Sequence, residues 1–404
     1  MVMNMDIKKD FPIFDIYPNL AYFDSSSTAL IPKVSIDATT HFLTETIASA
    51  RRGAYHLVTS SNTQIENVRG SLAEFLQVQS SEISFQNTVP AAVASILYGY
   101  PWKSKNRDKI VIAENEEHSV LASTLRAAEV MNLKIEFLPI DQKGTLILDN
   151  IDSIIDDRTG IVVVGQTVLG NGSKNPVNEI SNIAHGQDAI VLSDMTRSLD
   201  FYNNPLGSIQ TDIILLSANH GFLSPPGLFI QWINPDIGQN FKPGILGGTS
   251  VVNISKTTFD ISLQPDKFES GIINVPAIIG LGASIEYLNN LKLKDLTEHI
   301  QTMKHYLLSH LSTIEQVQLY DDPLSDSTIL SFNFGEESDM GCHDIALFLD
   351  QYNISVRSGF LCAHPLVSKL SNDGIVQISL HIYNTITDCQ RLVESIETIA
   401  NDFL

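Results

Sequence analysis

Residues 212–229, D-I-I-L-L-S-A-N-H-G-F-L-S-P-P-G-L-F, join a short apolar run to a cluster of turn-forming residues. The apolar run is Ile213–Leu216, and Ser217, His220, two prolines and Gly227 follow it. This order predicts a buried strand that runs into a tight loop and then into a second strand. Taken alone, the pattern indicates no more than a loop at the end of a core strand.

Size and composition are those of a globular protein. The chain has 404 residues, of which 43% are hydrophobic and 18% are charged. This length suffices for two domains, or for one large domain with a smaller partner. The formal net charge of −21 argues against nucleic acid and anionic membranes as partners, because both attract basic surfaces. An acidic docking face and a host with a generally acidic proteome both explain this charge.

The sequence shows no sign of a membrane segment, a secretion signal or a metal site. No apolar run is long enough to span a bilayer, and the first ten residues, M-V-M-N-M-D-I-K-K-D, lack the apolar core of a signal peptide. The three cysteines have no CxxC spacing and indicate neither a disulfide framework nor a zinc site. We therefore expect a soluble, cytoplasmic protein without a bound metal.

Predicted strands and helices alternate from about Tyr22 to Trp232. This alternation predicts a largely parallel sheet that helices cover on both faces. Ligands of such sheets bind beyond the carboxyl ends of the strands. The expected elements are strands at Asn19–Asp24, Ile83–Gln86, Lys109–Ala113, Thr159–Gly165 and Asp188–Leu192, a helix at Asn62–Phe75, and a helix from Pro32 to about Ala50.

The C-terminal part predicts a smaller domain of α+β type. It begins with a long helix over Ile278–Leu288, and shorter helices and strands then alternate. We expect these helices at Leu296–Leu311 and His343–Gln351, and these strands at Ser327–Phe334 and Val376–His381. The predicted divisions are an N-terminal segment (1–20) that packs on the small domain, a large domain (21–275) and the small domain (276–404).

Three further blocks carry a family resemblance. Lys267–Asn274 reads K-F-E-S-G-I-I-N, Ile278–Leu288 reads I-I-G-L-G-A-S-I-E-Y-L, and Ser355–Pro365 reads S-V-R-S-G-F-L-C-A-H-P. Together with residues 212–229 they resemble the class V aminotransferases, and within these the SUF-type cysteine desulfurases. The resemblance runs over nearly the whole chain. It implies an α/β, pyridoxal phosphate (PLP)-dependent transferase-like fold (fold type I) with a mostly parallel central sheet in the large domain, and it implies a homodimer.

In that family, a lysine in a Ser-Gly-His-Lys motif holds PLP as a Schiff base. Residues 212–229 contain no lysine. Counting forward from Asp212 places His220 at the lysine position, whereas counting back from Gly227 places Gly221 there. Loss of the lysine removes ordinary desulfurase turnover, because its amine supplies transimination and the proton shuttle. The resemblance therefore implies PLP bound non-covalently at most, or no cofactor.

Other cofactor positions of the family are altered as well. Val89 and Pro90 replace the two threonines of the phosphate site, and Thr167 replaces the asparagine that bonds the PLP ring oxygen. The resemblance assigns cofactor contacts to Asp194, Thr88, Thr167, His118, Arg197, Ser217 and Thr249.

Two of these assignments have a second interpretation. Asp194 matches the aspartate that pairs with the pyridinium nitrogen, and Arg197 replaces a glutamine, but an internal ion pair between the two explains them equally well. At the position that stacks on the ring, the alignment places Glu117, and a shift by one residue places His118. A surface histidine at a helix start explains His118 equally well.

Cys362 stands where the family carries its nucleophilic cysteine, which becomes a persulfide. Arg357 and the small residues around it match that motif, whereas Phe360 replaces its histidine. A lone cysteine is usually a small core residue, but this much of the motif favours the same loop. At the substrate site, Gln377 replaces the arginine that clamps the substrate carboxylate, and a neutral amide cannot form that bidentate charged pair.

Three functional hypotheses follow from the resemblance. The favoured one is a non-catalytic homologue, either a dimeric scaffold or a sulfur-transfer partner of an iron–sulfur assembly protein, with Cys362 carrying sulfur. The second is an enzyme that binds PLP non-covalently and uses His220 as a base. The third is an active cysteine desulfurase or selenocysteine lyase-type enzyme in which another lysine, such as Lys242 or Lys256, reaches the site.

Overall fold

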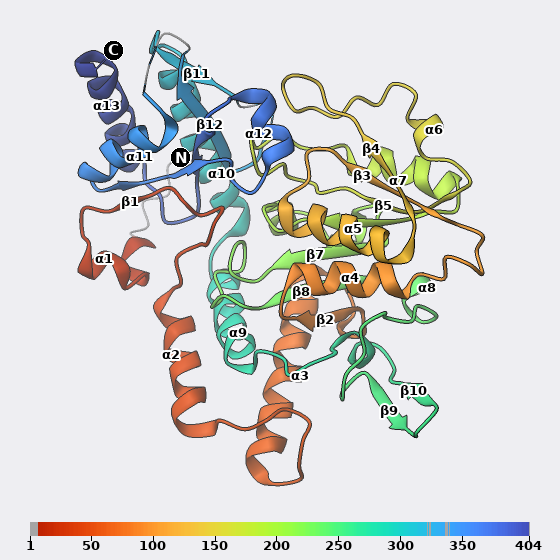
Figure 1. Ribbon diagram of the computed structural model, residues 1–404. Coiled ribbons are helices and arrows are strands. Elements are labelled where there is room, and N and C mark those ends of the chain that lie inside the picture. The colour runs from red at the N-terminus through yellow and green to blue at the C-terminus, as the bar shows by residue number, and fades with distance from the viewer. Residues whose placement is uncertain (1–6, 321, 323–324, 336–337, 339, 404) are drawn as a thin grey trace.

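The structure, a computed structural model, describes residues 7–320, 322, 325–335, 338 and 340–403. A seven-stranded sheet of order β2-β8-β7-β6-β5-β3-β4 forms the centre of the large domain (Figure 1). Every neighbouring pair from β7 to β4 is parallel, whereas β8 runs antiparallel to both β7 and β2. The strands are β2 Ile83–Gln86, β3 Lys109–Ala113, β4 Lys134–Leu138, β5 Thr159–Val163, β6 Ile190–Asp194, β7 Ile213–Ser217 and β8 Phe229–Ile233.

Strand β7 is buried on both faces, and this explains its continuous apolar run Ile213–Leu216. Ile213 and Leu215 pack into a core with helices α4 (Val89–Gly99) and α5 (His118–Met131) on one face. Ile214 and Leu216 pack on the other face, in the core that includes α3 (His56–Leu76) and α9 (Val275–Asn289). Because side chains alternate along a strand, a strand buried on both faces reads as a continuous apolar run.

Helices complete the large domain and connect it to the small one. Asn274 caps α9 by accepting a hydrogen bond from the Ala277 N–H at 3.2 Å, and Pro276 lies in the first turn. α9 then packs against α2 and α3. The other α-helices up to residue 240 are α1 Ile13–Ile16, α2 Lys33–His41, α6 Ile151–Ile154, α7 Val177–Gly186 and α8 Pro235–Gly238, with a hairpin of β9 Val251–Ile254 and β10 Phe259–Ile261 beyond them.

Several predicted boundaries shift by one to three residues, and α3 begins at His56, six residues before the predicted Asn62. Three further boundaries also need correction. The strand expected at 188–192 is Ile190–Asp194, because Asp188 has a φ of 60° in the turn after α7 and cannot begin an extended strand. The strand expected over 19–24 is only β1, Ala21–Tyr22. The helix expected to reach about Ala50 ends in a π-helical turn, Phe42–Thr46.

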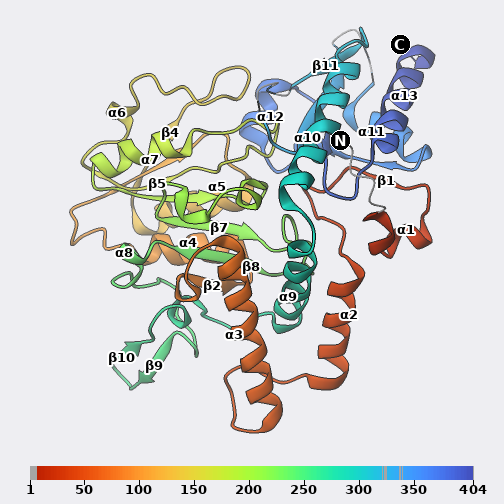
Figure 2. The same cartoon turned by 180° about the vertical axis from the view of Figure 1, so that it is seen from behind.

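The small domain is an antiparallel sheet of order β11-β12-β15-β14 with helices around it. Its strands are β11 Val317–Leu319, β12 Ile329–Phe334, β14 Arg357–Gly359 and β15 Ile375–Ser379, and β13 (Ile354–Ser355) pairs with β1. Its helices are α10 Leu293–Leu311, α11 Cys342–Gln351, α12 His364–Leu370 and α13 Ile386–Phe403. Figure 2 shows α9 and α10 in succession between the two domains.

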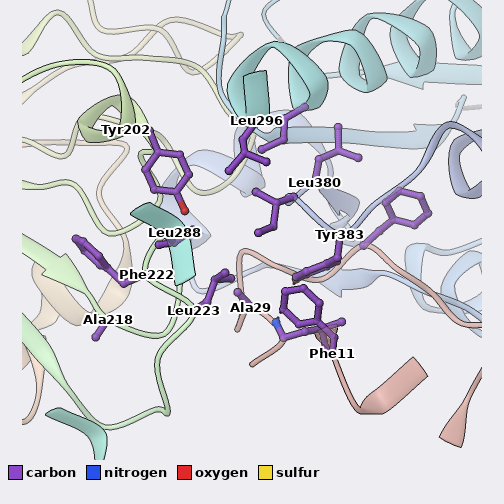
Figure 3. Packing of buried hydrophobic residues seen from close by; sticks show 14 of the residues in the cluster. Phe11, Ala29, Tyr202, Ala218, Phe222, Leu223, Leu288, Leu296, Leu380 and Tyr383 are labelled. Carbon is purple, nitrogen blue, oxygen red and sulfur yellow. Dashed lines mark hydrogen bonds between the residues drawn. The ribbon is translucent and has the colours of Figure 1, made fainter. Parts of the chain in front are cut away.

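One hydrophobic core crosses the domain boundary. Figure 3 shows Phe222, from the loop after β7, in the same cluster as Leu288 of α9 and Tyr383 of the small domain. Phe11 of the N-terminal segment packs on Tyr383 with ring centroids 5.0 Å apart. Residues 212–229 therefore belong to the contact between the domains.

Among the described residues, no helix is both long and apolar enough to cross a membrane.

Candidate functional site

The carboxyl ends of β3, β5 and β6 meet around one small cavity. It has a volume of about 10 Å³, the space of about one water molecule. Its lining residues are Asn115, Glu116, Glu117, Gly165, Thr167, Val168, Leu169, Asn175, Asp194, Thr196 and Arg197. This is the sheet edge at which the sequence predicted a ligand, and its side chains leave little free space.

Asp194 lies on the β6 side of this cavity. Its Oδ1 atom accepts a hydrogen bond from the Thr196 backbone N–H at 2.9 Å. Burial raises the pKa of Asp194, the Glu117 carboxylate raises it further, and the Arg197 guanidinium acts in the opposite direction. The ion pair of Arg197 is formed with Glu117, at 3.5 Å between Nη2 and Oε2, and not with Asp194 as one interpretation of the sequence had it.

The two candidates for the ring-stacking position lie in different surroundings. Glu117, the N-cap residue of α5, lines the cavity. His118 contacts the small domain, where its ring stacks on that of His364 with centroids 4.7 Å apart and its Nε2 lies 3.1 Å from His364 Nδ1. Its backbone N–H also donates to the Cys362 carbonyl oxygen at 2.9 Å. The structure thus brings His118 to the cysteine loop and leaves Glu117 at the cavity.

Cys362 lies on an exposed turn of the small domain. Leu361 and Cys362 have φ values of 55° and 57°, a left-handed conformation that non-glycine residues rarely adopt. The Arg357 Nη2 atom lies 3.5 Å from Cys362 Sγ. The other two cysteines, Cys342 and Cys389, are buried, and burial raises the pKa of both thiols. Cys362 is therefore the one of the three cysteines that solvent reaches, and a cation faces its sulfur.

His220 follows β7 and is buried against the N-terminal part of the chain. Its Nε2–H donates to the Ser26 carbonyl oxygen at 2.7 Å, and its Nδ1 has no partner in the protein. Burial lowers the pKa of His220 to about 3, and the charge of Arg197 lowers it further. A Cβ at Gly221 would lie 2.6 Å from the Phe201 ring, so a side chain has no room there. Of the two candidate lysine positions, only 220 admits a side chain.

Gln377 is fully buried, and both ends of its amide are used within the protein. Its Nε2 donates to the Leu169 carbonyl oxygen, and its Oε1 accepts from the Ser26 hydroxyl at 2.5 Å. The amide therefore joins the small domain to the β5–α7 loop and to the turn after β1. A bound ligand can reach it only if these two hydrogen bonds break.

The remaining predicted positions have other local roles or lie elsewhere. Thr88 is exposed and caps α4, accepting from the Ala91 N–H at 3.2 Å. Ser217 is buried and donates to Asn219 Oδ1. Thr249 lies before the β9–β10 hairpin, which both views place at the opposite end of the molecule from the small domain (Figures 1 and 2). Within one chain, the cavity at Asp194 brings together Thr167, Asp194 and Arg197, and its lining does not include Thr88, Ser217 or Thr249.

Sequence reasoning missed two residues of this region. The Glu116 carboxylate accepts a hydrogen bond from the Gly165 backbone N–H, and burial, together with the Asp194 charge, raises the pKa of Glu116 to about 8. Ser26 bonds both His220 and Gln377. The run Ser25-Ser26-Ser27, with three hydroxyls directly after a strand, was a signal for Ser26. Nothing in the sequence separated Glu116 from its acidic neighbours.

These residues do not fit PLP as the family holds it. Residues 212–229 have no lysine, and the cavity at Asp194 offers space for about one water molecule. The Glu117–Arg197 ion pair lines that cavity, and the Gln377 amide is already bonded. Three buried polar atoms around the cavity, Thr167 Oγ1, Thr196 Oγ1 and Arg197 Nε, have no partner in the protein. In the described part of the chain, this cavity included, no cluster of three or more His, Cys, Asp or Glu residues is arranged to hold a metal ion.

Comparison with known proteins extends over the whole chain. The family model described as Aminotransferase class-V matches residues 21–392. A probable cysteine desulfurase of Methanothermobacter thermautotrophicus is 31% identical over 399 residues, which cover 98% of each chain. The cysteine desulfurase of Escherichia coli K12 is 28% identical over 410 residues, which cover 99% of each. The apo structure of cysteine desulfurase from Thermococcus onnurineus NA1 has a TM-score of 0.89 at 26% identity, with coverage of 99% of this chain and 98% of that one.

Proposed function

Because the chain belongs to the class V aminotransferase family, we propose that it keeps the fold and the cysteine loop of its desulfurase relatives without their lysine-based PLP chemistry. In this proposal Cys362 accepts sulfane sulfur and passes it on. The observation that carries the proposal is the exposed Cys362 thiol with the Arg357 guanidinium 3.5 Å from its sulfur. The nucleophilic form of a cysteine is the thiolate, and a guanidinium beside the sulfur can pair with it during attack.

The transfer step needs no external oxidant. The Cys362 thiolate attacks the terminal sulfur of a donor persulfide, R–S–SH, and forms a new S–S bond. The donor S–S bond breaks, the donor leaves as a thiolate, and Cys362 carries the terminal sulfur with its proton. The reverse exchange with an acceptor thiolate regenerates Cys362. An iron–sulfur assembly protein with an exposed thiol is the kind of acceptor that this chemistry serves.

The geometry supports His220 poorly as the base of a PLP enzyme. A buried imidazole whose pKa is lowered to about 3 accepts a proton at neutral pH far less readily than an ordinary histidine. Its Nε2–H is also fixed on the Ser26 carbonyl. The alternative with more support is an active cysteine desulfurase, because the similar proteins carry that name. Such an enzyme needs an amine from elsewhere, such as exposed Lys242 or Lys256.

Sulfur acceptance is tested by mass spectrometry after exposure to a low-molecular-weight persulfide donor. We expect one added sulfur on the peptide that contains Cys362, and faster iodoacetamide labelling of Cys362 than of the two buried cysteines. Arg357→Gln should slow both reactions, whereas Arg126→Gln, which removes an exposed arginine paired with Glu129, should not. Modification of Cys342 or Cys389 ahead of Cys362 would contradict the proposal.

Aldimine formation is tested separately. The protein is incubated with PLP and reduced with borohydride, and the peptides are then mapped. We expect no specific PLP–lysine adduct, because the loop after β7 offers no amine. A stoichiometric adduct on one lysine would establish the active-desulfurase alternative instead.

We also infer that the protein is a homodimer and that the β9–β10 hairpin contacts the second copy. Val252, Ile254 and Leu263 on or beside this hairpin are 77%, 71% and 85% exposed, and their burial against a second copy would remove this apolar surface from water. Ile254→Lys should weaken the dimer in light scattering at micromolar concentration. Ile16→Lys is the matched control, because Ile16 on α1 is equally exposed at 71% and lies far from the hairpin. A monomeric wild-type protein would refute the inference.

A further inference from the structure

Arg197 supplies the positive charge at the cavity beside Asp194. Its guanidinium pairs with Glu117, and the two side chains are only 14% and 9% exposed. Glu116, Glu117 and Asp194 bring three carboxyl groups to the same cavity. Of the residues that line this cavity, Arg197 is the one with a positive charge, so it compensates the acidic groups that an incoming cation would otherwise meet.

Arg197 also separates two spaces. It lines both the cavity of about 10 Å³ and a polar cavity of about 250 Å³ between Asp200, α10 and residues 326–328. Thr167 is shared by both cavities in the same way. A shorter side chain at 197 would therefore remove one of the two residues that stand between these cavities and enlarge the space beside Asp194.

We propose that the Glu117–Arg197 ion pair closes the site at Asp194, so that the arginine occupies, in space and in charge, the position of a cationic ring ligand. The chain thereby excludes PLP and related pyridines by means of its own side chain, and not only by lacking a lysine. This inference does not depend on the role of Cys362, since the two sets of residues are tested by different measurements.

The test uses pyridoxamine 5′-phosphate, which has no aldehyde and cannot form adducts with surface lysines. Binding is measured by equilibrium dialysis with detection of the ligand's fluorescence. We expect wild-type protein to show no saturation up to about 1 mM ligand. Arg197→Gln removes the ion pair and shortens the side chain, and it should bind at least about tenfold more tightly because the guanidinium no longer fills the site beside Asp194.

Two further variants complete the design. Arg197→Met removes the charge but keeps most of the length, so it should bind less tightly than Arg197→Gln and more tightly than wild type. Arg158→Gln, which breaks an exposed ion pair with Asp108, should bind like wild type. If Arg197→Gln does not fold, Arg197→Met and the wild-type titration still decide the question.

Two results would overturn the proposal. One is micromolar binding by the wild-type protein, which would mean that the ion pair does not exclude the ligand. The other is unchanged binding in folded Arg197→Gln or Arg197→Met, which would mean that something other than Arg197 keeps the site closed. Neither result bears on persulfide formation at Cys362.

Discussion

Replacing Glu116 by glutamine should stabilise the protein at neutral and alkaline pH. Glu116 is fully buried, and its pKa is raised from 4.5 to about 8, first by burial and then by the Asp194 charge. Between these values the folded state keeps a proton that the unfolded chain has already released. The contribution of Glu116 to stability is therefore fully present below pH 4.5 and is lost as the pH rises toward 8.

The magnitude follows from these two pKa values. At about 1.4 kcal/mol for each pH unit between them, the fold loses about 3 kcal/mol at pH 7 relative to pH 4. Glutamine has nearly the shape of the protonated acid, and its Oε1 can still accept from the Gly165 N–H. We therefore expect Glu116→Gln to have a free energy of unfolding about 3 kcal/mol above wild type at pH 7, and little difference at pH 4.

Urea unfolding at a series of pH values from 4 to 9 measures this difference. Glu74→Gln is the matched control, because Glu74 is exposed on α3 and its substitution should leave the pH dependence unchanged. Difference infrared spectra at pH 7 provide an independent measurement, in which wild type should show a protonated carboxyl band that Glu116→Gln lacks. A stability difference that does not grow with pH, or a variant less stable than wild type at pH 8, would refute the reasoning.

Three further predictions concern stability. Arg69→Met should lower the free energy of unfolding by about 1.5–3 kcal/mol in urea, because it removes the Arg69 partner that the buried Glu269 carboxylate holds at 2.8 Å, while the Arg51 partner remains. A loss below about 1 kcal/mol would contradict this prediction. Gln377→Arg, which restores the family's residue, should lower the free energy of unfolding by about 3 kcal/mol or more, since it places a charge where the amide bonds Leu169. We do not expect this substitution to create a binding site for a carboxylate. The neutral imidazoles of His220 and His381, whose pKa values burial lowers from 6.5 to about 3 and about 4, stabilise the fold above pH 6.5. That contribution falls as the pH drops toward 4. His381→Gln should therefore make the free energy of unfolding fall less steeply between pH 6.5 and pH 4. An unchanged slope of the free energy against pH would contradict the assignment.

The large sheet and the loop after β7 could be predicted from the sequence because their signals are local. Ile213–Ser217 reads as a strand buried on both faces, and Thr88 and Asn274 cap the helices that follow them by bonding residues three positions away. The missing lysine was also visible from residues 212–229 alone. Strand boundaries were less certain, since a single left-handed residue, Asp188, moves the start of β6.

Only the tertiary structure decided what the polar residues of the site do. Glu117 and His118 are neighbours, yet one meets Arg197 and the other meets His364, each far away in the sequence. Gln377 is bonded by Ser26, 351 residues away. The protonation of Glu116 depends on burial and on Asp194, which reaches it from another strand. A local pattern specifies which backbone conformation a segment prefers, but the charge and the bonding of a side chain depend on which distant groups the fold places against it.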